Sequence, residues 1–182
     1  MSEPVNTDRI AYDARPRRPA WGVSTPLRKS LSTREPLLVA PPPAVVCISL
    51  AQGPGVVALP IVVPGQRVAC GEPIGEPAEP GLPRVHASIG GLVTHVEVRQ
   101  VAGSDGAMPC VVIRGSGAEE RWAGYAPDAE AGNRPARDLR ERIAAAGIIG
   151  LGGALFPTAR KLAMAADAPV LLLNGAECEP YV

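Results

Sequence analysis

The sequence has few aromatic residues and no excess of charge of either sign. Aromatic side chains make up 3% of the 182 residues, and 18 Lys and Arg balance 18 Asp and Glu to a formal net charge of zero. Proteins that bind single-stranded nucleic acid stack its bases on aromatic rings, and duplex DNA and anionic membranes attract basic surfaces. The composition therefore argues against a nucleic-acid-binding protein and against a charge-driven membrane association.

Long apolar runs and an export signal are also missing. No run of about eighteen apolar residues, the length that spans a bilayer, occurs in the sequence. The first residues, Met1 to Pro4, are not followed by a basic and then an apolar region. We therefore expect a soluble chain, unexported by itself, with no direct membrane span.

The cysteines are too far apart to suggest a metal cluster. Consecutive cysteines lie 23 or more residues apart and form no Cys-x-x-Cys pair, so we predict no metal site and no iron–sulfur ligand motif. Reduced thiols in a cytosolic protein are the simplest interpretation, with disulfides and zinc as alternatives. The four cysteines are Cys47, Cys70, Cys110 and Cys178. The two histidines, His86 and His95, are expected at the surface or in turns.

Glycine and proline are abundant, with 20 and 21 residues, and proline marks the first segment. Residues 1–43 hold eight prolines and no sustained periodicity. Because proline fixes φ and disfavours helix in the preceding residue, we predict an extended Pro/Arg-rich arm over 1–43 that wraps a partner or another part of the chain.

Residues 44–122 have the pattern of a small β domain. Short β-branched runs recur at intervals of about ten residues between Gly and Pro turn signals, which is typical of a sandwich or barrel. We expect turns at 65–66 and 90–91. The expected strands are 45–48, 56–57, 61–63, 92–98 and 110–113.

Residues 132–182 have the pattern of the beginning of an α/β domain. A helix capped by Asn133 and ended by Gly147 is followed by a glycine-rich turn and by a second helix over 159–166. Residues 170–173 then read as a buried strand. One strand with one crossover helix is half of an α/β sheet and leaves an apolar face open.

Two blocks of the third segment carry a family resemblance. The block 150–158, followed by Lys161-Leu162, and the block 174–181 closely resemble the RnfC subunit of the Rnf (Rsx) electron transport complex. The first block is also similar to the glycine-rich loop of the flavin subunit of respiratory complex I. Upstream, residues 63–76 and 85–93 resemble the barrel-sandwich, lipoyl-like module of RnfC.

The resemblance implies a mixed α+β fold, in which a β barrel-sandwich (lipoyl-like) module precedes the start of an α/β flavin/NADH-binding domain. It implies a subunit that oxidises NADH in an NADH:ferredoxin-type oxidoreductase, with FMN and two [4Fe-4S] clusters. The cluster motifs of longer relatives are absent from these 182 residues. The implied partners are other subunits of a membrane electron transport complex, which would hold the chain on the cytoplasmic side, peripheral to the inner membrane.

Nine residues are candidates for binding FMN and NADH. Glycines that open a helix present backbone N–H groups to a phosphate or a flavin edge, and a lysine in the next helix supplies a cation. The alternatives are glycines that only supply an unusual φ, a solvated lysine and an ordinary Asn-Gly turn. The candidates are Gly150, Gly152, Gly153, Phe156, Thr158, Lys161, Asn174, Glu177 and Glu179.

We assign no catalytic residue, because hydride transfer between nicotinamide and flavin needs stacking geometry and not a protein proton donor. Glu177 matches the second acidic residue of the complex I stretch, whereas the first is Ala176 here. Lipoyl domains carry a cofactor lysine in the hairpin that corresponds to 77–82, and no lysine occurs there. Two alternatives stay open: a non-catalytic docking or assembly fragment of such a complex, and a relative of cobalamin reductases.

Overall fold

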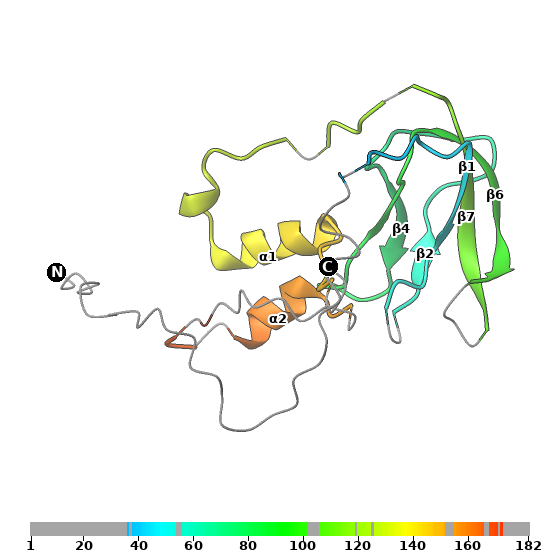
Figure 1. Ribbon diagram of the computed structural model, residues 1–182. Helices are drawn as coiled ribbons and strands as arrows, with labels where there is room; N and C mark the ends of the chain where they lie inside the picture. Colours follow the sequence, from blue (N-terminus) through cyan, green and yellow to red (C-terminus); the bar gives the residue numbers. More distant parts are fainter. Residues whose placement is uncertain are drawn as a thin grey trace. The chain divides into compact units, whose positions relative to one another are not determined.

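The computed structural model describes residues 36, 38–53, 56–101, 106–118, 120–124, 126–151, 155–165, 168–170 and 172 (Figure 1). Most of these residues belong to one compact unit, Val39–Leu172. The residues 1–38 and 173–182 form a second unit, which lies almost entirely outside the described residues. The predicted extended arm over 1–43 therefore stays a prediction, because residues 1–35 and 37 lie outside the described residues.

A four-stranded antiparallel sheet forms the larger half of the β domain. Its strand order is β1-β7-β6-β3, and β6 pairs with β7 along almost its whole length. The strands are β1 (Val45–Ser49), β3 (Arg67–Val68), β6 (Gly91–Gln100) and β7 (Ala107–Gly115). Central strand β7 is buried over residues 110–113, because it carries neighbours on both edges.

A second, three-stranded antiparallel sheet has the order β2-β4-β5. Its strands are β2 (Ala58–Pro60), β4 (Pro73–Pro77) and β5 (Val85–His86). Buried aliphatic residues from both sheets form one cluster, and the largest fully buried side chains are Leu50, Ile74, Ile113, Val93 and Val111. Burying such a side chain contributes about 1.5–3 kcal/mol, so this cluster is the main source of the β domain's stability.

The β6–β7 pairing requires a residue without a side chain at the start of β6. A Cβ atom added to Gly91 would lie 2.1 Å from the carbonyl oxygen of Arg114 on β7. Only glycine allows the two strands to approach this closely, which explains the second glycine of the pair at 90–91.

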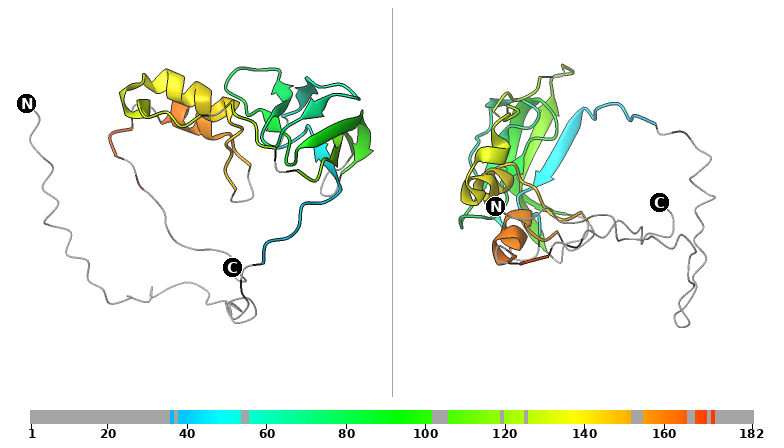
Figure 2. Two further views of the ribbon diagram at one scale, coloured as in Figure 1. Left: turned by 90° about the horizontal axis from the view of Figure 1, so that it is seen from above. Right: turned by 90° about the vertical axis from the view of Figure 1, so that its left-hand side faces the viewer.

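The helices follow in chain order as a short 3-10 helix η2 (Ala131–Asn133), α1 (Ala136–Ala145) and α2 (Thr158–Met164). Helices α1 and α2 pack side by side (Figure 2). Gly147 has a φ of +70° and its N–H bonds to the carbonyl of Ala144, so it ends α1 as expected. Among the described residues, no helix is long and apolar enough to cross a membrane.

Some local predictions were wrong. Asn133 does not cap α1, because it lies in η2 and its side chain donates to Glu130 at 2.7 Å, while Pro135 occupies the cap position. Residues 56–57 and 61–63 are not strands, since Val57 makes an isolated bridge with Ala51 and the chain leaves the ladder after Pro60. The predicted strand at 170–173 falls partly outside the described residues, and both Val170 and Leu172 are exposed and unpaired with any strand that the structure describes.

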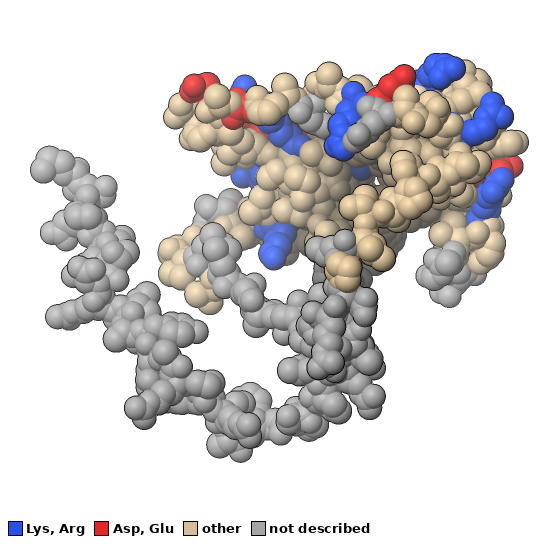
Figure 3. Space-filling view, turned by 45° about the horizontal axis from the view of Figure 1, so that its top comes forward, with Lys and Arg blue, Asp and Glu red and all other residues tan. Residues whose placement is uncertain are grey.

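Charged side chains do not gather into a single patch on the face of the molecule in Figure 3, where Lys and Arg are scattered among uncharged residues. This distribution agrees with the balanced net charge of the sequence. A continuous basic groove for nucleic acid is absent from the part of that face that the structure describes.

Candidate functional site

A closed turn joins α1 to α2 and holds the glycine-rich sequence. At its base, Ile149 and Pro157 form an antiparallel bridge. The N–H of Gly150 donates to the carbonyl of Phe156 at 2.9 Å, and the N–H of Thr158 donates to the carbonyl of Ile148 at 3.2 Å. These bonds close the turn from both sides, so the Gly150 and Thr158 amides are occupied within the chain.

The outer surface of the turn combines apolar and cationic side chains. Leu151 is 88% exposed and Phe156 is 45% exposed, although both are large apolar residues. Lys161 lies on α2, one turn beyond Pro157, whose carbonyl accepts its N–H. Its side chain is exposed and makes no ion pair with a described residue. An exposed aromatic ring and an exposed ammonium on neighbouring stretches of chain are groups that an aromatic, phosphorylated ligand can use.

The structure brings together four of the nine candidate residues: Gly150, Phe156, Thr158 and Lys161, all within the turn and the first turn of α2. The other five lie outside the described residues and stay predictions; these are Gly152, Gly153, Asn174, Glu177 and Glu179. The Gly150 amide closes the turn, while binding of a cofactor by Gly150 and by the other candidates stays a prediction.

Sequence reasoning did not foresee that the barrel hairpin at 77–84 contacts the helices. Arg160 of α2 forms an ion pair with Glu79 at 2.6 Å, across 81 residues of sequence. The N–H of Arg84 donates to the carbonyl of Ala144 near the end of α1, at 3.2 Å. The hairpin that carries a cofactor lysine in lipoyl domains therefore contacts the segment that holds the glycine turn.

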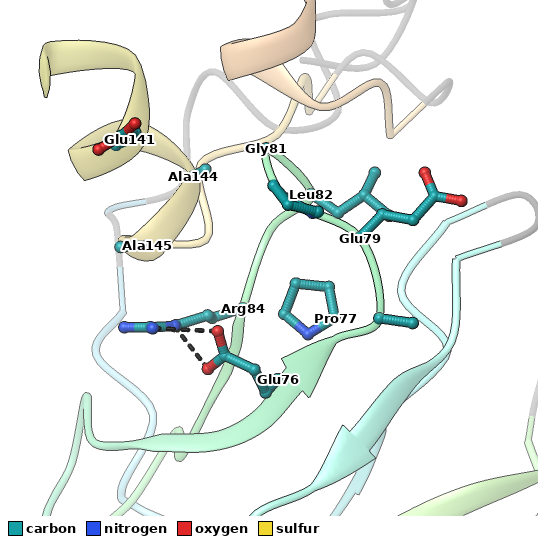
Figure 4. A pocket seen from close by; sticks show the side chains of 11 residues that line it. Glu76, Pro77, Glu79, Gly81, Leu82, Arg84, Glu141, Ala144 and Ala145 are labelled. Carbon is teal, nitrogen blue, oxygen red and sulfur yellow. Dashed lines mark hydrogen bonds and ion pairs between the residues drawn. The ribbon is translucent and has the colours of Figure 1, made fainter. Parts of the chain in front are cut away.

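A cavity of about 330 Å³ lies between this hairpin and α1 (Figure 4). Arg84 and Glu76 form its floor, with Arg84 Nη2 and Nε at 3.0 and 2.7 Å from the two carboxylate oxygens. Glu141 and Ala144 line it from α1. Because the Glu76 carboxylate is already paired with Arg84, the floor carries little net charge.

His86 and Gly147 lie close together where the hairpin meets the end of α1. A Cβ atom added to Gly147 would lie 2.6 Å from the carbonyl oxygen of Arg84 and 2.9 Å from His86 Nδ1. Burial lowers the pKa of His86, and the nearby Arg84 lowers it further, against a hydrogen bond with the Ala145 backbone that raises it. His86 is thus a half-buried strand residue, and the prediction of a surface or turn histidine was wrong for it.

A metal centre finds no support in the part of the chain that the structure describes. No group of three or more His, Cys, Asp or Glu side chains there is placed to hold a metal ion. Cys47, Cys70 and Cys110 are free thiols, and Cys178 lies outside the described residues.

The fold and the turn together define a class of protein: a β barrel-sandwich domain followed by the beginning of a flavin-binding domain. Residues 19–118 match the family of the RnfC barrel sandwich hybrid domain, and residues 143–182 match the Nuo51 FMN-binding domain. The first match covers more than half of the chain, and the chain belongs to this RnfC family. The resemblance to RnfC and the barrel-sandwich fold are therefore confirmed.

The curated relatives carry consistent names. The chain is 38% identical over 163 residues to a subunit of the Na(+)-translocating ferredoxin:NAD(+) oxidoreductase complex of Acetobacterium woodii. It is 34% identical over 164 residues to the corresponding subunit of the ion-translocating oxidoreductase complex of Rhodobacter capsulatus, and 38% identical over 164 residues to that of Pseudomonas aeruginosa. Each match covers 88% of this chain but only 37%, 31% and 21% of the respective relative. The chain thus spans between about a fifth and two fifths of their length.

Proposed function

We propose that this chain is the flavin-binding part of an RnfC-type subunit, which takes electrons from NADH within a multi-subunit, membrane-associated oxidoreductase. One observation carries the proposal. The match to an FMN-binding domain, residues 143–182, includes the closed glycine turn together with the exposed Phe156 and Lys161. The match to a cofactor-binding domain and the exposed side chains of the turn therefore fall on the same residues.

The residues at the turn suit FMN in their chemical character. The exposed ring of Phe156 suits an aromatic ligand, and the ammonium of Lys161, one helical turn beyond Pro157, suits a phosphate. The backbone bonds of Gly150 and Thr158 keep the turn closed, so that this surface is formed before a ligand arrives.

When bound, FMN would supply hydride acceptance from NADH and release of electrons one at a time. In this proposal Lys161 binds the phosphate, Phe156 covers an apolar face, and Asn174 hydrogen-bonds a polar edge of the flavin. Glu177 and Glu179 are proposed contacts to the dinucleotide. The [4Fe-4S] clusters and the attachment to the inner membrane are assigned to other parts of the complex.

One observation favours a docking role as a second candidate. Leu59 on the edge strand β2, and Ile61 and Val63 just after that strand, are 63%, 50% and 64% exposed. Neighbouring exposed aliphatic residues of this kind mark protein contacts. A docking fragment without a cofactor would keep this surface and lose flavin binding.

The test is a titration of the purified, reduced chain with FMN, followed by quenching of flavin fluorescence. We expect saturable binding that weakens at least tenfold in Lys161→Ala and in Gly152→Val. The matched control is Arg140→Ala, which removes a half-buried cation on α1 away from the turn and should bind like the wild type. Absence of binding by the wild-type chain would reject the flavin-binding role and favour the docking role.

A further inference from the structure

Two cysteines that are far apart in sequence meet on the outer face of the larger sheet. In the β1–β7 pairing, Ile48 lies opposite Val111, and both side chains point into the core. Side chains alternate along a strand, so the adjacent residues Cys47 and Cys110 both point to the opposite face. Cys47 is opposite Val112 and Cys110 is opposite Ser49, which makes the two cysteines diagonal neighbours.

The two thiols interact, and they differ in their access to solvent. Cys47 is exposed, whereas Cys110 is fully buried. The Cys110 thiol donates to the carbonyl of Met108 at 3.3 Å. Burial raises the pKa of Cys110, and a hydrogen bond with the Cys47 thiol raises it further. Cys110 is therefore kept protonated and shielded, and Cys47 is the thiol that a reagent in solution reaches first.

One ion pair lies next to Cys110 on the neighbouring strand β6. On the other side of β7, Glu97 of β6 lies opposite Cys110 and forms an ion pair with Arg99 at 2.6 Å. The carboxylate opposite Cys110 on β6 is thus neutralised by a guanidinium.

We propose that Cys47 and Cys110 form a redox modification site, in which a hydroperoxide oxidises the two thiols to a disulfide between β1 and β7. The Cys47 sulfur attacks one oxygen of hydrogen peroxide, which gives a sulfenic acid and one water. The Cys110 sulfur then displaces the hydroxyl from that sulfenic acid, and a second water leaves. Two thiols and one hydrogen peroxide give one disulfide and two waters.

The disulfide is expected to be readily reversible. Diagonal positions on paired strands are further apart than directly opposite ones, so the bond requires a local shift of β1 along β7. Strained disulfides have higher reduction potentials and are reduced more easily than relaxed structural ones. The site therefore suits transient oxidation better than permanent cross-linking.

The test uses the full reduced chain, treated with hydrogen peroxide, blocked with N-ethylmaleimide and digested with trypsin. Cleavage after Arg and Lys places each cysteine in its own peptide: 35–67, 68–84, 100–114 and 162–182. We expect 35–67 and 100–114 to appear joined, lighter than their sum by two hydrogen atoms, and to separate with dithiothreitol. The joined peptides should vanish in Cys47→Ser and in Cys110→Ser.

Cys70→Ser is the matched control, because Cys70 lies outside β1 and β7 and its thiol donates to the carbonyl of Ser88. This variant should still give the joined peptides. Cys47→Ser changes an exposed side chain, so it should fold like the wild type, as circular dichroism will check. A bridge from Cys47 to Cys70, to Cys178 or to a second copy would overturn the proposal. Peroxide treatment that leaves both thiols free, or that takes Cys47 to a sulfinic acid beside a free Cys110, would also overturn it.

Discussion

Arg160 on α2 and Glu79 in the β4–β5 hairpin are joined by an ion pair at 2.6 Å, although 81 residues separate them in sequence. Arg160 directly precedes Lys161, the candidate phosphate ligand. The same hairpin bonds to α1 through Arg84 and Ala144. The barrel hairpin therefore contacts both helices that flank the glycine turn. It has no lysine that could carry a covalent cofactor, unlike the corresponding hairpin of lipoyl domains.

Reversing one charge of this pair should loosen the hairpin contact. Glu79 and Arg160 are 67% and 45% exposed at their side chains, and exposed ion pairs are worth about 0–1 kcal/mol. We expect Glu79→Arg to lower the free energy of unfolding by less than about 1 kcal/mol and to speed hydrogen exchange of the Arg84 amide, measured by NMR. The double variant with Arg160→Glu should recover most of both effects.

The control for this pair is Arg137→Glu, which reverses one charge of the exposed Arg137–Glu141 pair within α1. It should leave the exchange of the Arg84 amide unchanged. Equal exchange in Glu79→Arg, Arg137→Glu and the wild type would show that the Glu79–Arg160 pair does not support the contact.

Replacing Gly147 should be costly for two reasons. Its φ of +70° disfavours any side chain, and an added Cβ would press against the Arg84 carbonyl and His86. We expect Gly147→Ala to lower the free energy of unfolding by at least about 1–2 kcal/mol, measured by urea denaturation. Gly132→Ala is the control, because an added Cβ there meets nothing within 4 Å. Equal stability of the two variants would contradict the packing described for Gly147.

The larger strands were predictable because their sequences are rich in β-branched residues. Residues 45–48, 92–98 and 110–113 all fall in strands β1, β6 and β7. Strands β3 and β5 contain two residues each, which is too short for any periodicity to show. The run at 61–63 has strand composition, but prolines at positions 60 and 64 bracket it and remove ladder donors.

The candidate site was predictable only in its local part. The glycine turn, Phe156 and Lys161 follow one another within twelve residues, so their motif is visible in the sequence. The contact of Glu79 with Arg160 and the meeting of Cys47 with Cys110 depend on tertiary packing and strand register. The spacing of these residues in the sequence does not predict either contact, because a single sequence does not determine how distant segments pair.

Acidification should destabilise the fold through His86. Burial lowers the pKa of His86 in the folded chain, whereas the unfolded chain titrates near 6.5. The unfolded state therefore binds the proton more tightly, and the free energy of unfolding falls as the pH drops below 6.5, until the pH is below the folded-state pKa.

Urea denaturation at pH 7.5 and at pH 5.5 measures this effect, because these values lie about one pH unit above and below the histidine pKa of the unfolded chain. We expect the fall in unfolding free energy between them to be smaller in His86→Gln than in the wild type. The exposed His95 is present in both proteins and serves as an internal control. An identical fall in both proteins would assign the pH dependence to other groups.

Binding of FMN at the glycine turn is tested most directly by hydrogen exchange of the full chain with and without saturating FMN, read by mass spectrometry. We predict slower exchange in peptides that cover the turn and α2, residues 148–164, and unchanged exchange in β6 and β7. Unchanged exchange over 148–164 while FMN is bound, or protection confined to the β domain, would contradict a flavin site at the glycine turn.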